Sequence, residues 1–419
     1  MKLRIKKIID LQSLLMWVGL LCVVSFALLE HMSIPIPMFS AIKLPILYAG
    51  GVCVIPLLPA LFGNIRKRRY FWIYLVLFAL CAALFVSMKQ NANTVIGYSP
   101  EQNTIRLVLY LLELFVLMLA FAERGMGGAA IKMVYSCVLF LVVLTDFFMF
   151  TGLLTFGTPD YPSYLVGTKF TVTYMHFNLL ALWVMQQWSK DGMKSVKKWR
   201  VWTAAAVVAL VAIYVDCMSG VLGSVLLAWL IVSRSGAPKI TQLLTSPWFF
   251  LICVVAATWI SFVIGFFLDL PFVTIFIEDV LGRNTTLTGR VAIYQGYGEM
   301  MQSHWLLGYG YGSGSQVSYQ FFGCANAQNA VLQWVLQSGV VVTALLITLF
   351  ALILRQLNIG RKEVKVAVEL LVVLIYVYIV LGIVEITYSM SFILFMALIF
   401  MAVNDKNFRV SSDEEQAAK

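Results

Sequence analysis

Apolar segments recur along almost the whole of this chain, and many of them run for about 18 residues or more. Such a segment predicts an α-helix that crosses a membrane, because about 20 apolar residues span the hydrocarbon core of a bilayer. The 419 residues are 61% hydrophobic and only 12% charged, a balance that soluble globular domains do not have. The sequence therefore predicts an all-α polytopic membrane protein.

The hydropathy pattern predicts twelve transmembrane spans. The first is not a cleaved signal peptide, because it lacks a small-residue cleavage site and another span follows soon after it. The eighth span is short, and a tight turn joins the last two. The predicted spans are residues 11–29, 44–62, 70–88, 104–122, 131–153, 171–188, 199–215, 221–233, 248–268, 330–354, 364–384 and 386–403.

Lysine and arginine are distributed unequally between the two sides of these spans. With the N-terminus placed in the cytoplasm, all but six of the 30 basic residues fall in inner segments, as the positive-inside rule requires. This asymmetry predicts that both termini are cytoplasmic. It also explains the net charge of +10 by contact with anionic lipid headgroups, without nucleic acid as a partner. The six outer basic residues are Lys43, Lys89, Arg106, Lys169, Arg283 and Arg290.

The predicted spans form one transmembrane domain, residues 1–404. A short polar tail, residues 405–419, follows it, and we expect this tail to be cytoplasmic and disordered. The largest outer loop, residues 269–328, joins spans nine and ten and holds Arg283 and Arg290. A second outer loop, residues 155–170, contains Lys169. Because cations are scarce on this side, these loop cations need an explanation other than topology.

The seven cysteines are scattered, and most lie inside apolar runs. They show no metal-ligand spacing such as C-x-x-C, which favours the interpretation that they are small hydrophobic residues of helices. The carboxylates and histidines show no metal-ligand spacing either. The sequence therefore predicts no metal and no other cofactor.

Arg290 belongs to a segment whose apolar positions fit one face of a short helix at the membrane interface, with Thr288 as its N-cap. The helix dipole disfavours a cation in the first turn, and a bound anion would offset that cost. The planar guanidinium and the helix N-terminal amides both suit phosphate oxygens. The alternative is an arginine that extends to lipid phosphates. The apolar positions are Val291, Tyr294, Tyr297 and Met301.

Alternating glycines follow in the sequence GYGYGSG, residues 308–314. They permit a tight backbone path, but their spacing is not that of a dinucleotide-binding loop. Two interpretations remain open. The segment either presents backbone amides and the rings of Tyr309 and Tyr311 to a sugar, or it is a plain re-entrant turn.

Two of the three histidines are candidates for acid–base chemistry on the outer side. His176 lies near the outer end of the sixth predicted span, and it either faces one cavity with Lys169 or makes a packing hydrogen bond. His304 lies in the large outer loop. Among the carboxylates in or beside spans, Asp216 and Glu385 lie at outer span ends, at the depth expected for a base at an external site.

Three outer segments resemble the O-antigen ligase and polymerase superfamily, which includes bacterial capsular and exopolysaccharide polymerases. They read LTGR at residues 287–290, SHWLLGYGYGSG at residues 303–314 and AQNAVLQWVLQSGVVV at residues 327–342. Their order, spacing and position after the ninth predicted span are similar to those of the family. YLVGTKFTVTYMH at residues 164–176 resembles an element of capsule polymerases, and DCMSGVLGSVL at residues 216–226 resembles a helix start of the family.

The chain departs from the family pattern at two positions. The family histidine that precedes an asparagine is Gln328 here, followed by Asn329. Glutamine is no base at neutral pH, although its amide hydrogen-bonds sugars. The family arginine that follows the serine near Ser219 is Gly220 here. The candidates to replace the missing positive charge and the missing imidazole are Lys169 or Arg283, and His176 or His304.

The resemblance implies a GT-C-like glycosyltransferase in the bacterial cytoplasmic membrane, with its active site facing outward. It implies a polysaccharide polymerase that transfers a glycan from undecaprenyl pyrophosphate to the terminal hydroxyl of another lipid-linked repeat unit. The alternatives are an O-antigen-type ligase with another acceptor, a transporter or flippase for lipid-linked oligosaccharides, and a catalytically silent scaffold. The implied partners are the lipid-linked oligosaccharide and the bilayer, with a chain-length regulator and a flippase as further candidates.

This chemistry assigns roles to the outer polar residues. Arg290, then Arg283 and Lys169, would stabilise charge on the departing pyrophosphate. His176, His304 and then Asp216 are the candidates for orienting the hydroxyl and accepting its proton. The candidates for binding the glycan are Gln328, Asn329, Tyr309 and Tyr311.

Overall fold

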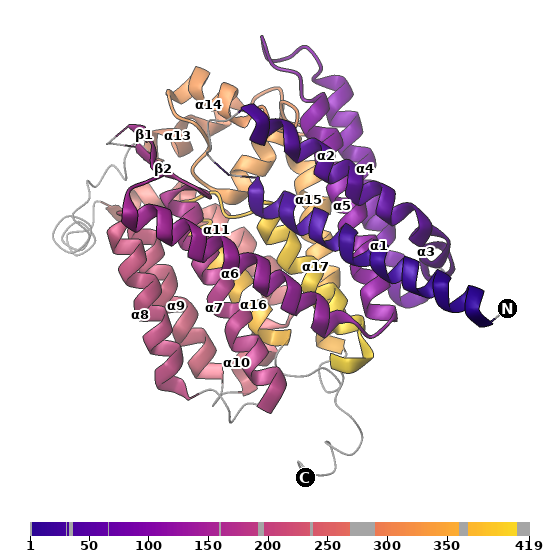
Figure 1. The fold of residues 1–419 in the computed structure, drawn as a ribbon. Coiled ribbons are helices and arrows are strands. Elements are labelled where there is room, and N and C mark those ends of the chain that lie inside the picture. The colour runs from indigo at the N-terminus through magenta and orange to yellow at the C-terminus, as the bar shows by residue number, and fades with distance from the viewer. Residues whose placement is uncertain are drawn as a thin grey trace.

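The computed structural model describes residues 2–30, 32, 37–65, 67–158, 161–191, 197–234, 238–268, 290–359 and 368–408. Within these ranges the chain is a bundle of α-helices with one small β-sheet (Figure 1). The first half contains α1 (Lys2–Leu29), α2 (Pro37–Val54), α3 (Leu58–Ile65), α4 (Arg68–Gln90), α5 (Glu101–Glu123), α6 (Gly127–Thr151), α7 (Lys169–Asp191) and α8 (Lys198–Tyr214). The second half contains α9 (Met218–Arg234), α10 (Pro238–Leu244), α11 (Pro247–Leu268), α13 (Arg290–Met300), α14 (Gly314–Phe322), α15 (Ala330–Ile359), α16 (Glu369–Leu381) and α17 (Met390–Asn404).

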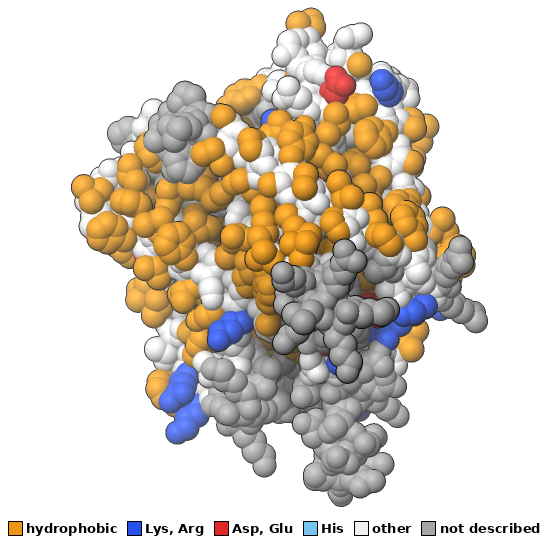
Figure 2. Space-filling view, turned by 45° about the vertical axis from the view of Figure 1, so that its right-hand side comes forward, with side chains coloured by type: hydrophobic (Ala, Val, Ile, Leu, Met, Phe, Trp, Pro, Cys, Tyr) orange, Lys and Arg blue, Asp and Glu red, His pale blue; other side chains and the backbone are white. Residues whose placement is uncertain are grey.

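Five of these helices are long and apolar enough to cross a membrane: α4, α5, α6, α15 and the Leu11–Leu29 part of α1. Shorter apolar helices accompany them, among them α9, α16 and α17. Large hydrophobic side chains such as Phe140, Leu210 and Val255 are exposed on the outside of the bundle. Figure 2 shows hydrophobic side chains over the middle of the molecule and most of the visible lysines and arginines towards one end. This surface supports a multi-pass membrane protein.

Each predicted span overlaps a helix, but two of them are interrupted and a third ends early. In the predicted span 44–62, α2 ends at Val54, and a 3-10 turn, η1 (Ile55–Leu57), with Pro56 inside it leads into α3. In the predicted span 330–354, α15 breaks at Gly339, whose φ of 77° and ψ of 172° are not helical. The predicted span 364–384 ends early, because α16 stops at Leu381. The interruptions in α15 and after α16 both lie beside the cavity described below.

The prediction of a tight turn between the last two spans is wrong. Residues 382–389 form an open connection between α16 and α17. Two hydrogen bonds connect it to α16 and α15. Thr387 Oγ1 donates to the Tyr378 carbonyl oxygen at 2.7 Å, and Trp334 Nε1 donates to the Tyr388 carbonyl oxygen at 2.8 Å. These bonds hold the connection inside the protein, where it reaches the cavity.

A three-stranded antiparallel sheet occupies the predicted loop 155–170. Its strands are β1 (Phe156–Thr158), β2 (Tyr161–Tyr164) and β3 (Gly167–Thr168), in the order β1-β2-β3. Phe156 pairs with Ser163, and Ser163 pairs with Thr168. The sheet ends directly at Lys169, the first residue of α7, and so fixes where that helix begins.

Polar contacts at the basic end of the bundle connect helices that are distant in sequence. Arg124 donates to Gln12 Oε1 at 2.7 Å, and Asp405 Oδ2 accepts the Gly127 N–H at 2.6 Å. Asp405 is fully buried, and a 3-10 turn, η4 (Lys406–Phe408), continues from it. The predicted disordered tail is therefore folded over its first residues, 405–408, because Asp405 caps the start of α6. Residues 409–419 lie outside the described residues.

The glycine-rich segment docks onto the break in α15. The Tyr309 N–H donates to the Leu336 carbonyl oxygen at 3.0 Å, and the Val340 N–H donates to the Trp305 carbonyl oxygen at 2.8 Å. Gly308 and Gly339 have φ values of 64° and 77°, and a side chain at either would collide with the backbone of the other segment. Of the two interpretations of this segment, the structure places its backbone in packing against α15 and leaves Tyr311 to face the cavity.

Candidate functional site

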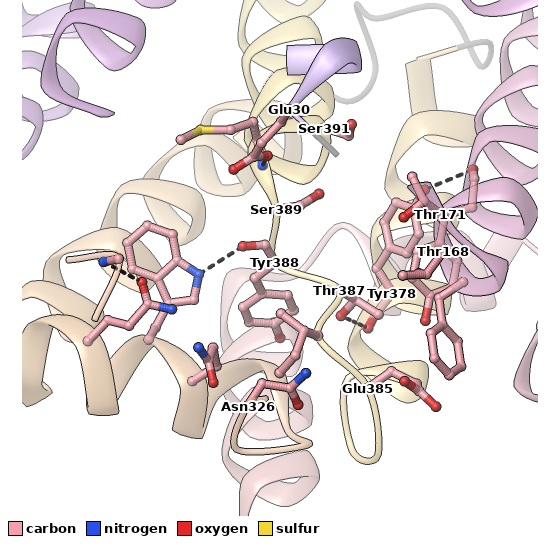
Figure 3. Close-up of a pocket in the computed structure, with 18 of the residues that line it drawn as sticks. Glu30, Thr168, Thr171, Asn326, Tyr378, Glu385, Thr387, Tyr388, Ser389 and Ser391 are labelled. Atoms are coloured by element: carbon pink, nitrogen blue, oxygen red, sulfur yellow. Dashed lines mark hydrogen bonds between the residues drawn. The ribbon is translucent and has the colours of Figure 1, made fainter. Parts of the chain in front are cut away.

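A cavity of about 620 Å³ is lined by Gly312 and Asn326, which lie on either side of α14, among other residues. Helices α13 and α14 lie at the end of the bundle opposite α10 (Figure 1). The N-terminal parts of α7 and α17 line it with Thr171 and Ser391, and the first half of α15 lines it with Trp334. The connection between α16 and α17 crosses it, so that Tyr388 and Glu385 face the cavity (Figure 3). Helix N-termini carry partial positive charge and unpaired amides, so their convergence favours an anionic ligand.

Aromatic rings and amides form much of the remaining wall. Tyr311 packs against Trp334 with ring centroids 5.5 Å apart, and Tyr378 donates to Asn178 Oδ1 at 2.5 Å. Gln337 Oε1 accepts the Gly312 N–H at 2.8 Å, which orients this amide at the wall. Rings that pack on a sugar face, combined with amides that bond hydroxyl groups, suit a saccharide ligand.

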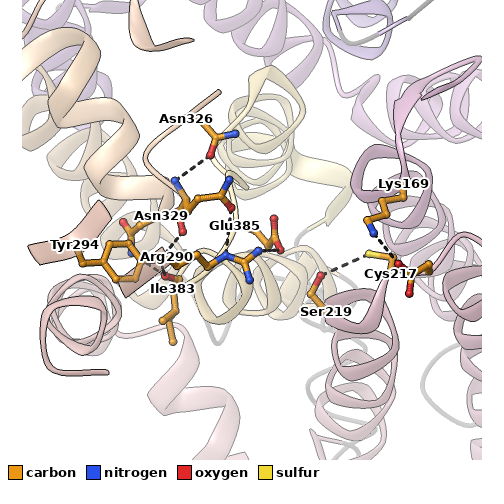
Figure 4. A network of polar contacts seen from close by, with 11 residues as sticks. Lys169, Cys217, Ser219, Arg290, Tyr294, Asn326, Asn329, Ile383 and Glu385 are labelled. Carbon is orange, nitrogen blue, oxygen red and sulfur yellow. Dashed lines mark hydrogen bonds and ion pairs between the residues drawn. The ribbon is translucent and has the colours of Figure 1, made fainter. Parts of the chain in front are cut away.

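Arg290 is the first residue of α13, and it contacts Gln328 and Glu385, which line the cavity (Figure 4). Its Nη2 donates to Glu385 Oε1 at 2.7 Å and its Nε donates to Gln328 Oε1 at 3.2 Å. The side chains are only 18% exposed for Arg290 and 7% for Glu385. Both acceptors line the cavity, so one guanidinium connects a buried carboxylate and an amide at its wall.

The backbone around Gln328 is held in an unusual conformation. Gln328 has a φ of 53°, which costs free energy for a residue with a side chain. Its N–H donates to Asn326 Oδ1 at 2.9 Å, and its carbonyl oxygen accepts the Tyr294 hydroxyl at 2.7 Å. These contacts compensate for the strain and aim the Gln328 amide at Arg290.

Burial raises the pKa of the Glu385 carboxyl to about 7, although the positive charges of Arg290 and Lys169 favour its ionised form. A carboxyl with this pKa exchanges protons readily near neutral pH, whereas an ordinary glutamate stays ionised. Glu385 therefore has the position and the proton affinity of a general base that faces the cavity.

Lys169 and Asp216 form a second ion pair beside this centre (Figure 4). Lys169 Nζ lies 3.0 Å from Asp216 Oδ2, and the side chains are 30% and 66% exposed. Asp216 has a φ of 54°. In the described part of the chain, Asp216 and Gln328 are the two non-glycine residues with positive φ. The structure thus brings Arg290, Gln328, Lys169 and Asp216 into one neighbourhood.

Gly220, where the resembled family has an arginine, has no space for a side chain. A Cβ atom there would lie 3.0 Å from both Ala212 Cβ and Thr173 Oγ1. Helices α7, α8 and α9 therefore pack too closely at this point for the family arginine. Lys169 supplies positive charge nearby from the start of α7.

Neither candidate histidine lines the cavity. His176 Nε2 lies 3.2 Å from Asp146 Oδ2 on α6, and its Nδ1 lies 2.8 Å from the Val172 carbonyl oxygen. His304 stacks on Tyr309, with ring centroids 3.8 Å apart, and burial lowers the pKa of its imidazole. His176 thus faces α6, and His304 belongs to the docked glycine-rich segment.

The remaining predicted site residues divide into three groups. Tyr311 faces the cavity, whereas Tyr309 donates its hydroxyl to the Met300 carbonyl oxygen at 2.6 Å. Asn329 is fully buried, and its Oδ1 accepts the N–H groups of Val331 and Leu332 at 2.9 Å, so it caps α15. Arg283 and Thr288 lie outside the described residues.

Several cavity residues were not predicted as site residues. The sequence places Glu385 at the depth expected for an external base but does not include it among the candidate site residues, and it places Trp334 and Tyr388 in apolar spans. Lys43 and Arg106 also line the cavity. The signal for this last pair was present in the sequence, because both belong to the six basic residues on the predicted outer side.

A scan of known protein families finds no family that matches this chain, and a search of curated proteins finds no significant match.

The ion pair of Arg290 and Glu385 should be strongly coupled. Arg290→Ala should reduce stability by about 3 kcal/mol, because it leaves a buried carboxylate without its counter-ion. The double variant Arg290→Ala/Glu385→Ala should lose much less than the sum of the two single variants. Thermal unfolding of the purified proteins measures this, with Lys67→Ala as a control at an exposed ion pair, where about 1 kcal/mol or less is expected. Additive losses at Arg290 and Glu385 would contradict the coupling.

Proposed function

We propose that this chain is a membrane-embedded glycosyltransferase that polymerises lipid-linked glycans. Its donor is a glycan on undecaprenyl pyrophosphate, and its acceptor is the terminal hydroxyl of another lipid-linked repeat unit. Twelve spans with both termini in the cytoplasm would place the cavity at the outer face of the bacterial cytoplasmic membrane. The main support is one arrangement: Arg290, at a helix N-terminus, is bonded to a carboxylate and an amide that both line a cavity walled by aromatic rings.

In this proposal Arg290 holds two partners. Its guanidinium has five N–H donors, and within the described residues one bonds Gln328 and one bonds Glu385, so that others are left for diphosphate oxygens. The amides at the start of α13 favour the same anion. Lys169, from the neighbouring ion pair, adds positive charge. Charge that develops on the leaving diphosphate would be stabilised there.

The proposed step is a displacement at the anomeric carbon of the donor glycan. The acceptor hydroxyl oxygen forms a bond to this carbon, and the bond from the carbon to the diphosphate oxygen breaks. Its electron pair leaves with the diphosphate, and the hydroxyl proton passes to the Glu385 carboxylate. We assign this proton to Glu385 in preference to His176, His304 and Asp216, because Glu385 is the carboxylate that lines the cavity next to Arg290.

The cavity wall would bind the glycan itself. Trp334, Tyr388 and Tyr311 offer ring faces, and Gln333 and Gln337 offer amides. The exposed apolar surface of the bundle would leave the prenyl chain in contact with lipid, so only the diphosphate and the sugars need to enter the protein. A ligase differs from a polymerase only in its acceptor, so the reaction product distinguishes them.

Arg290→Ala should abolish chain elongation while the protein still accumulates in the membrane. The purified protein, supplied with lipid-linked repeat units, should produce a ladder of longer glycans, and the variant should lose at least about 100-fold of this rate. Arg200→Ala, on the exposed start of α8, is the matched control and should behave like the wild type. Wild-type polymer length in Arg290→Ala would remove Arg290 from the site, and transfer of unextended oligosaccharide across a bilayer would indicate a transporter.

Elongation should depend on pH through Glu385. Because the pKa of this carboxyl is raised to about 7, the base is present above this pH and is lost as the pH falls through it. The rate should therefore fall about tenfold per pH unit on the acid side. Glu385→Gln should be slow at every pH and should lack this acid limb. The same acid limb in Glu385→Gln would assign the base to another group.

A further inference from the structure

A second group of charged side chains lines the other end of the same cavity. Lys43 on α2 and Arg106 on α5 line it together with Glu30, which follows the end of α1. Lys43 Nζ donates to the Glu30 carbonyl oxygen at 2.9 Å, and the Glu30 carboxylate accepts the Met390 N–H at 3.2 Å. Lys43 also lies within electrostatic reach of Arg106. These contacts bring two cations and one carboxylate together at the starts of α2, α5 and α17.

The Arg106 guanidinium is incompletely bonded. Its Nη1 donates to Asn103 Oδ1 at 3.4 Å, near the limit of a hydrogen bond. Its Nε is buried, and no described residue accepts a hydrogen bond from it. Buried guanidinium N–H groups are normally paired with an acceptor, and a planar oxyanion is the acceptor that fits their fork best. Arg106 therefore has donors to offer to a ligand in the cavity.

The charge at this end remains positive. The carboxylate of Glu30 is held at the N-terminus of α17, where the helix dipole stabilises its negative charge. Lys43 bonds the carbonyl oxygen of Glu30 and lies in the cavity wall together with Arg106. With two cations against one carboxylate among the described lining residues, this end attracts an anion.

The two charged ends are separated by the part of the cavity that suits a saccharide. Figure 3 shows Glu30 and Glu385 at opposite ends, with Ser389, Tyr388 and Thr387 between them. The Glu30 carboxylate accepts the Met390 N–H, so the chain from residue 385 to residue 390 sets an upper limit on the separation. Five residues span at most about 18 Å, so the separation of the two ends has the upper limit of a short saccharide's length, and the cavity between them has a volume of about 620 Å³.

We propose that Lys43 and Arg106 form a second anion-binding subsite, which binds an oxyanion of the glycan-bearing substrate that does not occupy the Arg290 end. This inference rests on the proposed function, which assigns the donor diphosphate to Arg290. The oxyanion is either the diphosphate of a second lipid carrier or an acidic group, such as a uronate carboxylate, on the saccharide. In both cases its charge would fix the acceptor in the cavity, with its hydroxyl towards Glu385.

Binding stoichiometry tests this subsite in the purified full-length protein in lipid nanodiscs. The probes are geranylgeranyl diphosphate and a glucuronate-containing disaccharide, and native mass spectrometry counts the bound molecules. The variants are Lys43→Gln, Arg106→Gln and Arg290→Gln, with Arg106→Lys to keep the charge if Arg106→Gln does not fold. Lys89→Gln, at the exposed end of α4, is the matched control.

If the anion is a second diphosphate, the wild type and Lys89→Gln should bind two molecules of geranylgeranyl diphosphate. Lys43→Gln and Arg106→Gln should then bind one, and Arg106→Lys should bind two. If the anion is an acidic sugar, the wild type should bind one diphosphate, and Lys43→Gln and Arg106→Gln should weaken disaccharide binding about tenfold or more. Wild-type binding of both probes by Lys43→Gln and Arg106→Gln would overturn the proposal.

Arg290→Gln separates this inference from the proposed function. Loss of one diphosphate in Arg290→Gln, with unchanged binding in the Lys43 and Arg106 variants, would support the donor site and reject the second subsite. Unchanged diphosphate binding in Arg290→Gln, with a loss in the Lys43 and Arg106 variants, would reject the proposed donor site instead.

Discussion

The ion pair between Arg290 and Glu385 is the interaction on which the candidate site depends. Both side chains are largely buried at one end of an apolar bundle, with 18% of Arg290 and 7% of Glu385 exposed. A buried charge is strongly destabilising without its counter-ion, so each residue depends on the other. The surrounding structure serves to hold them in contact: Gln328 adopts a left-handed conformation, and Tyr294 bonds both Gln328 and Ile383. Burial raises the pKa of the Glu385 carboxyl to about 7 against the opposing charge of Arg290, and proton transfer near neutral pH requires a pKa in this range.

The cavity itself exists because helices are interrupted there. Backbone that leaves the helical conformation is tolerated at membrane depth only where it is enclosed by protein or lines a cavity. The break of α15 at Gly339 and the open connection 382–389 both meet this condition, since protein donors and acceptors bond their backbones. The glycine-rich segment packs against the break, and the starts of α7 and α17 line the cavity. Interruption of regular helices therefore creates space for polar chemistry inside a predominantly apolar protein.

Sequence reasoning predicted the parts of this structure that depend on local pattern. Apolar runs located the long helices, and the periodicity after residue 289 located α13 with Arg290 in its first turn. Local patterns do not predict contacts between distant segments. Glu385 lies 95 residues from Arg290, and nothing in the sequence around either residue indicates that the two are in contact. The orientation of His176 towards Asp146, 30 residues away, depends on how α7 rotates against α6, which packing decides. Gly339 lies inside the predicted span 330–354, and the break in α15 became visible only through its contacts with the glycine-rich segment.

The orientation of the cavity in the membrane tests the proposed function most directly, because the proposed lipid-linked substrates would reach the cavity from the outer side. Ser315 is exposed on α14, near the cavity, and Lys198 is exposed at the start of α8, at the basic end. In a variant with its seven native cysteines replaced, a cysteine at each position can be labelled with a membrane-impermeant maleimide on intact cells. We predict that Ser315→Cys reacts in intact cells and that Lys198→Cys reacts only after the cells are opened. The reverse pattern would place the cavity in the cytoplasm and contradict the proposed reaction.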